Sequence, residues 1–289
     1  MTFDSGFLGP RDLLVNGKFC IEESTVLEVR LFVQRARDLP LTEYALVNLY
    51  GVEDFQYNDL YDIFQRLLVE YNNINQECAV HSGLFKELQH ICERLIDLSS
   101  SAKQDYDPIF ANLKKIYNGE GDTDALRRDV EADINTRLTE IGEVESSVET
   151  ATTTINTWDN ANVVHKARLG AIITDIEQRV KDTPELEKKR DGFWGNFGDP
   201  VWRLEMGAVL DLLFSSVVVG DFQSLLGGWH ALKSDLAGLS EFIKNNTEPA
   251  PGLLANLEEN SILYQWQLLE PTVRDLLDNS IKPAVAENQ

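Results

Sequence analysis

Residues Val130 to Trp158 read VEADINTRLTEIGEVESSVETATTTINTW, and the spacing of their apolar residues decides the fold class. Apolar or small side chains recur every three or four residues, at Val130, Ile134, Leu138, Ile141, Val144, Val148, Ala151, Ile155 and Trp158. Because an α-helix completes one turn in ~3.6 residues, this spacing places all of them on one face. The stretch therefore predicts a long helix that packs along its length against other helices.

The same period continues on both sides of this stretch, from Ala125 to about Lys181. An unbroken helix over that range would be on the order of 85 Å long. The polar segment TATTTINTWDNAN (residues 150–162) lies inside the range and is a candidate position for a bend or a tip.

Most of the chain beyond residue 20 has helical period, whereas strand-like alternation is scarce. The breakers and caps predict the remaining elements. The first are a helix at 25–37 with Ser24 as N-cap, a second at 42–51 behind Thr42, and a third from Asn58 or Asp59 to Pro108 that Gly83 weakens or kinks. A turn at 118–122 and a loop at 191–202 come later in the chain. The last are a helix from Met206 that Gly227 and Gly228 interrupt or kink and that resumes to Ile243, and a helix at 253–277 before a polar tail.

These elements predict an all-α protein, an elongated antiparallel helical bundle or coiled coil with a small N-terminal helical cap. We expect residues 1–57 to form the cap and residues 58–289 to form the bundle, as a single continuous domain.

Composition and charge narrow the function. The 289 residues include 26 Lys and Arg against 48 Asp and Glu, a formal net charge of -22 that repels nucleic-acid backbones. The N-terminus lacks a basic segment followed by an apolar run, and no window approaches the ~20 apolar residues of a spanning helix. We therefore expect a protein made soluble in the cytoplasm, without nucleic acid as a partner.

The chemistry-bearing residues predict neither an enzyme nor a cofactor or metal site. The chain has no Gly-rich phosphate loop, His-Glu-x-x-His motif or nucleophile elbow. Cys78 and Cys92, read as members of one helix, would lie roughly 21 Å apart, too far for a disulfide. His81 and His90 cannot join them around one ion on a straight helix, so buried thiols are expected, and no catalytic, cofactor-binding or metal residues.

Two segments are candidates for contact with a membrane or a partner. The loop at 191–202 is rich in aromatic residues, and the run from Met206 to Val219 is the most apolar of the chain, although it contains Asp211. The alternative for the loop is a hydrophobic staple, and the alternative for the apolar run is a buried helix packed among the others. For both segments, external contact and internal packing stay open. The candidate contact residues are Phe193, Trp194, Phe197, Trp202, Val209, Leu210, Leu213, Phe214, Val217 and Val218.

The N-terminal third carries a more specific pattern. A short helix leads into ARDLPLTEYALVNLYG (residues 36–51), followed by LYDIFQRLLVEYNNI and GLFKELQHICERLIDLSSSAKQ, with Leu39, Pro40, Thr42, Tyr50 and Gly51 at the turn and at the helix end. This pattern resembles the head-region start of the alpha-xenorhabdolysin A component family, among the cytolysin-A-like helical pore-forming toxins. The later stretch LGGWHALKSDLAGLSEFI (residues 226–243) is also similar to a returning helix of such toxins.

The resemblance implies a component of an α-helical pore-forming toxin. Such a component is soluble when released, and associates with a target membrane, with a second toxin subunit, or with both as a homo- or hetero-oligomer. The alternative is a cytosolic coiled-coil interaction or scaffold protein without membrane activity, for which the acidic exterior and the long apolar face suffice. A strongly apolar hairpin would separate the two classes, and the turn at 118–122 and the segment at 150–162 are not such hairpins.

Overall fold

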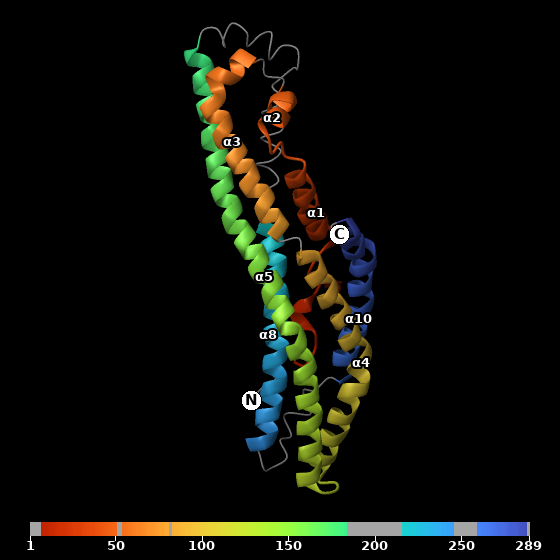
Figure 1. Ribbon diagram of the computed structural model, residues 1–289. Coiled ribbons are helices and arrows are strands. Elements are labelled where there is room, and N and C mark those ends of the chain that lie inside the picture. The colour runs from red at the N-terminus through yellow and green to blue at the C-terminus, as the bar shows by residue number, and fades with distance from the viewer. Residues whose placement is uncertain (1–6, 51–53, 81–82, 184–215, 246–258, 288–289) are drawn as a thin grey trace. The chain divides into compact units, whose positions relative to one another are not determined.

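The computed structural model describes residues 7–50, 54–80, 83–183, 216–245 and 259–287. Nearly all of the described chain is helical, which confirms the predicted all-α class. The elements in order are η1 (Arg11–Leu13), β1 (Leu14–Val15), β2 (Lys18–Phe19), α1 (Glu23–Arg37), α2 (Glu43–Tyr50), α3 (Asp54–Val80), α4 (Leu84–Asn118), α5 (Thr123–Asp182), α8 (Ser216–Asn245), α10 (Glu259–Leu276), the π-helical segment η2 (Leu277–Ile281) and α11 (Lys282–Glu287) (Figure 1).

The chain divides into two compact units. Unit 1 comprises Met1–Val26, Leu84–Thr153 and Gly220–Gln289, and unit 2 comprises Leu27–Gly83 and Thr154–Val219. The divisions fall inside α1, α5 and α8, so these helices contribute to both units. The predicted cap boundary between residues 57 and 58 lies inside α3, and the division into cap and bundle stays a prediction.

Unit 1 is a helical bundle in which α4 packs between α10 and the first part of α5 (Figure 1). Two tryptophans lie at its centre without solvent exposure, Trp229 of α8 and Trp266 of α10. The indole N–H of Trp229 donates to the carbonyl of Ile141 at 3.1 Å, and that of Trp266 donates to the carbonyl of Leu8 at 3.0 Å. Burial of both rings therefore leaves neither indole donor unpaired.

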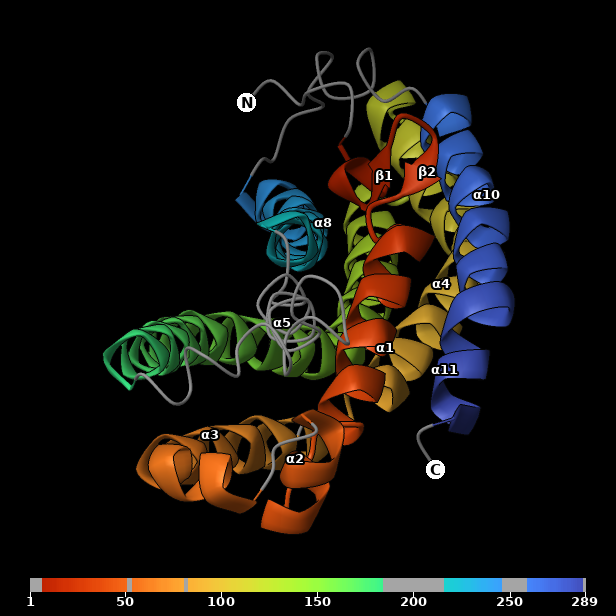
Figure 2. The same cartoon turned by 90° about the horizontal axis from the view of Figure 1, so that it is seen from above.

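A β-hairpin belongs to the same unit and lies beside α10, as the view from above shows (Figure 2). β1 and β2 pair antiparallel, with Leu14 opposite Phe19 and Val15 opposite Lys18. The two turn residues have positive φ angles, 53° at Asn16 and 76° at Gly17, as the tight Asn-Gly hairpin turn requires. The sequence reading missed this hairpin, although Asn-Gly between apolar residues is the signal that predicts one.

Unit 2 is built on antiparallel packing of α3 against the second part of α5. Apolar residues of both helices, among them Ile63 and Tyr71 of α3 and Leu169 of α5, are almost fully buried. Phe32 of α1 joins them, with its ring centroid 5.5 Å from that of Trp158. The α1 and α2 segments thus share a core with the two long helices.

The long helix α5 is continuous through the polar segment at 150–162. Its predicted apolar face is confirmed at eight of nine positions, each at most 2% exposed: Val130, Ile134, Ile141, Val144, Val148, Ala151, Ile155 and Trp158. At the ninth, Leu138 is only half-buried, and its neighbour Arg137 is buried instead at 1% exposure. The helix face therefore contains one charged residue where the pattern predicted an apolar one.

The predicted helix from residue 58 or 59 to Pro108 is wrong in both its ends and its continuity. The chain forms two helices, α3 from Asp54 and α4 from Leu84, so the position around Gly83 separates two helices rather than kinking one. Pro108 lies inside α4, which continues to Asn118. A proline removes one backbone hydrogen bond, and here its neighbours Ile109 and Phe110 are at most 2% exposed, so packing outweighs the loss.

The three cysteines are free and buried, as expected. Cys78 lies in α3 and Cys92 in α4, so the premise that both belong to one helix is wrong.

Two further boundaries differ from the predicted ones. Ser24 lies in the first turn of α1 and not at its cap, because the helix begins at Glu23 and the carbonyl of Glu22 already accepts from the N–H of Thr25 at 3.1 Å. The last helix does not end near residue 277 but continues through η2 to Glu287.

α8 is helical through Gly227 and Gly228, where an interruption or a kink was predicted. A Cβ at Gly228 would lie 2.9 Å from Cδ2 and 3.1 Å from the backbone nitrogen of Leu13. This glycine therefore permits close approach of the N-terminal segment to α8 instead of breaking the helix.

Candidate functional site

The corner between α1 and α2 is the structural form of the Leu-Pro-x-Thr pattern. α1 ends at Arg37, Pro40 is buried, and α2 begins at Glu43. The hydroxyl of Thr42 accepts from the backbone N–H of Ala45 at 3.2 Å, so the predicted N-cap is confirmed. Gly51 lies outside the described residues.

Two asparagines of α3 fasten this corner. The side-chain amide of Asn72 donates to the carbonyl of Leu41 at 3.2 Å, and that of Asn75 donates to the carbonyl of Ala36 at 3.0 Å. Ala36 belongs to the last turn of α1, where backbone carbonyls have no partner within the helix. α3 therefore supplies hydrogen bonds on both sides of the corner and folds the two short helices onto itself.

A buried polar cluster lies between α3 and α5 in unit 2. His165 of α5 is 3% exposed, with Nδ1 2.5 Å from a carboxylate oxygen of Glu70 and Nε2 3.0 Å from one of Glu77. Arg168 reaches the other oxygen of Glu70 at 3.5 Å. The cluster therefore places charged groups inside an otherwise apolar contact, where pairing determines whether burial is tolerated.

Two further ion pairs between the described parts of α3 and α5 are exposed. Arg66 lies 2.7 Å from Asp175, and Arg179 lies 3.2 Å from Asp62. Exposed pairs of this kind contribute less than about 1 kcal/mol each. Among these polar contacts between α3 and α5, those of His165 are therefore the buried ones.

Exposed large apolar side chains are concentrated in unit 2. Within the part of the chain that the structure describes, three lie in unit 1, namely Val15, Tyr117 and Tyr264. Seven lie in unit 2, namely Leu27, Leu31, Tyr44, Tyr61, Val69, Val163 and Val164. Single exposed apolar residues are normal on soluble proteins, but uneven distribution between two units indicates which unit is suited to contact an apolar partner.

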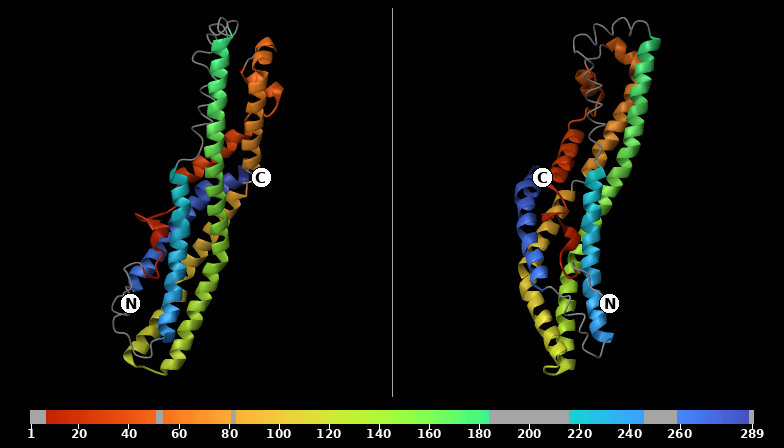
Figure 3. Two further views of the ribbon diagram at one scale, coloured as in Figure 1. Left: turned by 90° about the vertical axis from the view of Figure 1, so that its left-hand side faces the viewer. Right: turned by 180° about the vertical axis from the view of Figure 1, so that it is seen from behind.

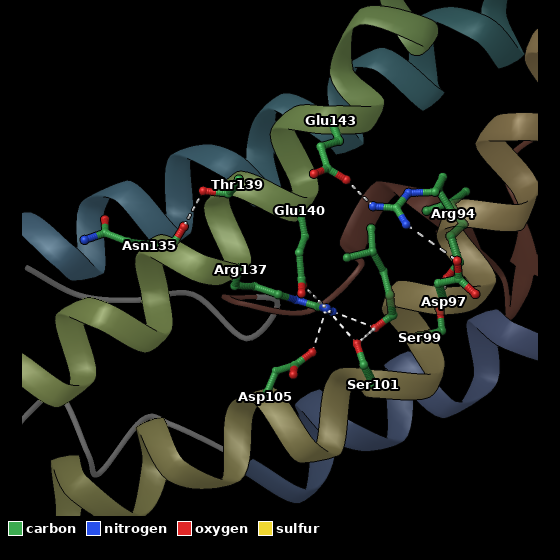
Figure 4. A network of polar contacts seen from close by, with 12 residues as sticks. Arg94, Asp97, Ser99, Ser101, Asp105, Asn135, Arg137, Thr139, Glu140 and Glu143 are labelled. Atoms are coloured by element: carbon green, nitrogen blue, oxygen red, sulfur yellow. Dashed lines mark hydrogen bonds and ion pairs between the residues drawn. The ribbon is translucent and has the colours of Figure 1, made fainter.

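Unit 1 has a different polar centre, at Arg137 of α5 (Figure 4). Its guanidinium donates to the carbonyl of Leu98 at 2.6 Å, to a carboxylate oxygen of Asp105 at 2.9 Å and to the hydroxyl of Ser101 at 3.1 Å. Glu140, one turn further along α5, lies 3.2 Å away. These contacts join α5 to α4 in the interior of the bundle.

Two aromatic rings complete the surroundings of Arg137. Its guanidinium carbon lies 5.4 Å from the ring centre of Tyr106 and 5.0 Å from that of Trp266, which is cation–π geometry. Burial raises the pKa of the Tyr106 phenol, and the nearby Arg137 charge opposes that shift only in part. Arg137 therefore has a structural role, holding α4, α5 and α10 around one charge.

The predicted membrane or partner residues are mostly not placed. Phe193, Trp194, Phe197, Trp202, Val209, Leu210, Leu213 and Phe214 lie outside the described residues, as does the 206–215 part of the 206–219 run. Val217 and Val218 lie in the first turn of α8, where Val218 is fully buried. Across the described ranges, no helix combines the length and the apolar character needed to cross a bilayer.

The sequence reading did not find His165 or Arg137, because each lies among apolar positions of α5 and finds its partners far away in sequence. Glu70 and Asp105 are 95 and 32 residues from His165 and Arg137, respectively. The only local signal for Arg137 was a polar residue next to a position predicted to be buried, since Arg137 directly precedes Leu138.

Solved structures include chains that are similar to this one. No family model matches the chain, and no curated protein sequence matches it. The structure is similar to XaxA from Xenorhabdus nematophila, with a TM-score of 0.39 and 11% sequence identity, over 93% of this chain and 99% of that one. An overlap at this level transfers no residue role to this chain.

Proposed function

We propose that this chain is a component of an α-helical pore-forming toxin, which associates with a target membrane and a second subunit through unit 2. The observation that carries the proposal is the concentration of exposed large apolar side chains in that unit. Apolar surface that water covers in the free protein is reburied against lipid or a partner, and this reburial drives the association.

The corner between α1 and α2 supports the same proposal. Leu39, Pro40 and Thr42 carry the resemblance to the toxin family, and the corner that they form is fastened to α3 by Asn72 and Asn75. In sequence, the aromatic loop at 191–202 and the apolar run at 206–219 add further apolar material for such a contact.

The polar cluster at His165 gives the mechanism a physical starting point. A helix pair held partly by buried charged groups exchanges partners at lower cost than one held by apolar packing alone, because the charges gain hydration when the helices separate. In the proposed mechanism, α3 and α5 separate on the target membrane, and their apolar faces pack against lipid or a subunit.

The test is association with lipid vesicles and dye release from them. The full chain is mixed with phosphatidylcholine vesicles, with and without added phosphatidylserine and a candidate partner subunit, and bound protein is measured by flotation. We expect binding, and dye release in at least the presence of the partner.

Matched valine-to-glutamate variants test whether vesicles bind to unit 2 rather than to unit 1. Val69 and Val163 of unit 2 are 59% and 65% exposed, and Val15 of unit 1 is 51% exposed. Burial of a valine side chain contributes about 1.5–3 kcal/mol, so Val69→Glu and Val163→Glu should each weaken vesicle binding at least about tenfold. Val15→Glu adds the same charge in unit 1 and should leave binding unchanged.

The result also decides between the proposal and the alternative. Absence of both binding and dye release under all these conditions would remove the toxin function. A stable soluble complex with a partner, in the absence of any lipid association, would favour a coiled-coil interaction or scaffold protein.

A further inference from the structure

We infer that the surface between α5 and α8 in unit 1 holds a divalent transition-metal ion of the zinc type, bound by Glu145, Glu149 and His230. This inference goes beyond the proposed function and does not depend on it. One ligand atom from each of the three residues lies within 4.8 Å of the others. α5 and α8 lie side by side in the ribbon and bring the three residues together, although His230 is 85 positions from Glu145 and 81 from Glu149 in sequence (Figure 3).

The spacing of these atoms fits an ion between them and does not fit hydrogen bonding. The Nε2 atom of His230 lies 3.8 Å from an oxygen of Glu145 and 4.0 Å from an oxygen of Glu149. Hydrogen bonds of this type have distances of about 2.7–3.2 Å, so neither pair is directly bonded. Zinc bonds to nitrogen and carboxylate oxygen are about 2.0–2.2 Å, which in tetrahedral geometry puts ligand atoms about 3.4 Å apart. The two distances from His230 exceed this value by about half an ångström, and the glutamate oxygens lie within 4.8 Å of each other.

The two glutamates are presented by one helix face. Glu145 and Glu149 are four residues apart on α5, so their side chains project from successive turns toward the same side. Lys233 of α8 lies 2.5 Å from the second oxygen of Glu145, which leaves the first oxygen directed toward His230. An outer partner on the non-coordinating oxygen orients a metal ligand in this way.

Contacts on both sides of the site hold the two helices in register. On one side the buried Trp229, adjacent to His230, donates to the carbonyl of Ile141 at 3.1 Å. On the other side the buried hydroxyl of Thr152 donates to the carbonyl of Phe222 at 3.3 Å. Because both anchors are buried hydrogen bonds, they hold the backbone near the three ligands in place, and the adjustment falls on the ligand side chains.

The donor set selects the class of ion. One imidazole and two carboxylates suit zinc and neighbouring transition metals, with water as a fourth ligand. Ca²⁺ takes six to eight oxygen ligands and Mg²⁺ prefers octahedral oxygen coordination, which this donor set does not offer. Bound zinc would cross-link α5 to α8.

The test is zinc titration of the metal-stripped full chain, with ZnCl₂ as the probe and a chromophoric chelator as competitor. We expect one site, and at least about tenfold weaker binding in Glu149→Gln and in His230→Gln, since even loss of an outer partner costs 10–100-fold. His90→Gln removes another exposed histidine of unit 1, from α4, and should bind zinc like the original chain. Neither CaCl₂ nor MgCl₂ should displace the ion.

A thermal measurement provides a second readout. Glu149 and His230 have side chains 57% and 51% exposed, so both substitutions should leave the far-UV circular dichroism of the apoprotein unchanged. Zinc should raise the Tm of the original chain and of His90→Gln, and not that of the two ligand variants. The inference is overturned if the original chain binds no zinc, or if the ligand variants bind it as tightly as His90→Gln does.

Discussion

Replacing Arg137 by alanine tests whether the buried guanidinium organises unit 1. The substitution removes the partner of the Leu98 carbonyl and of Asp105, and it removes the charge that lies against the Tyr106 and Trp266 rings. Breaking a buried ion pair by removing one partner costs about 3–5 kcal/mol. Asp105 is 26% exposed and regains some hydration, so the lower half of that range is expected.

A matched control lies on the same two helices. Arg94 of α4 pairs with Glu143 of α5, but its side chain is 29% exposed and that of Glu143 is 59% exposed (Figure 4). Its other contact, with Asp97 at 3.6 Å, lies on α4 itself. Arg94→Ala should therefore cost less than about 1 kcal/mol, the value of an exposed pair.

Urea unfolding followed by circular dichroism measures both effects. With a denaturant slope of about 2 kcal/mol per molar urea, Arg137→Ala should lower the midpoint by about 1.5–2 M, and Arg94→Ala by less than about 0.5 M. Equal and small shifts for the two variants would show that the Arg137 contacts contribute no more than a surface pair, and would refute the reasoning.

Further predictions concern the N-terminal contact, the corner and the thiols. Gly228→Ala should destabilise the protein by about 1–3 kcal/mol, because the new Cβ would lie 2.9 Å from the Leu13 side chain. Gly227→Ala is the control: no atom lies within 4 Å of its Cβ position, so it should be neutral or stabilising by up to about 1 kcal/mol. Equal urea midpoints for the two variants would contradict this prediction. Thr42→Ala should cost about 0.5–2 kcal/mol by loss of the cap, with Thr42→Ser as the control that retains it. Burial raises the pKa of the Cys78 thiol from 9.0 to about 12, so the folded state holds the proton that the unfolded state loses, and stability should fall as pH rises above about 9. Labelling of the folded chain by a thiol reagent at pH 8 should accordingly be about a thousandfold slower than in urea, and equal rates would show an accessible thiolate.

The sequence predicts the helices of this protein better than their connections. The apolar spacing of α5 was correct at eight of nine positions from Val130 to Trp158, because it records burial directly. Pro108 and Gly228 both led to wrong predictions of a break in a helix, and for the same reason. The sequence shows the backbone preference of a residue, whereas the fold also depends on what packs around that residue. At Pro108 the neighbouring side chains are buried in the core, and at Gly228 a distant segment approaches the helix.

The polar sites were harder to predict for a related reason. His165 faces Glu70, and His230 faces Glu145 and Glu149, across separations of 81 to 95 residues. Spacing within one helix shows that Glu145 and Glu149 share a face, but it does not show which histidine of another helix lies opposite. The Asn16-Gly17 turn differs from these polar sites, because the two adjacent residues by themselves carry the signal for a hairpin turn.

The assembly of unit 1 from separate chain segments has a consequence for its folding during synthesis. Its core is assembled from three separate segments, and the contact between Trp266 and Leu8 joins residues 258 positions apart. A ribosome that has reached residue 219 has made every residue of unit 2 but lacks the third segment of unit 1. Because contacts so distant in sequence form slowly, the N-terminal hairpin and α4 wait without their final partners while unit 2 is already able to fold. The nascent chain therefore exposes the unit 1 core for longer, and that interval is when chaperones are most needed.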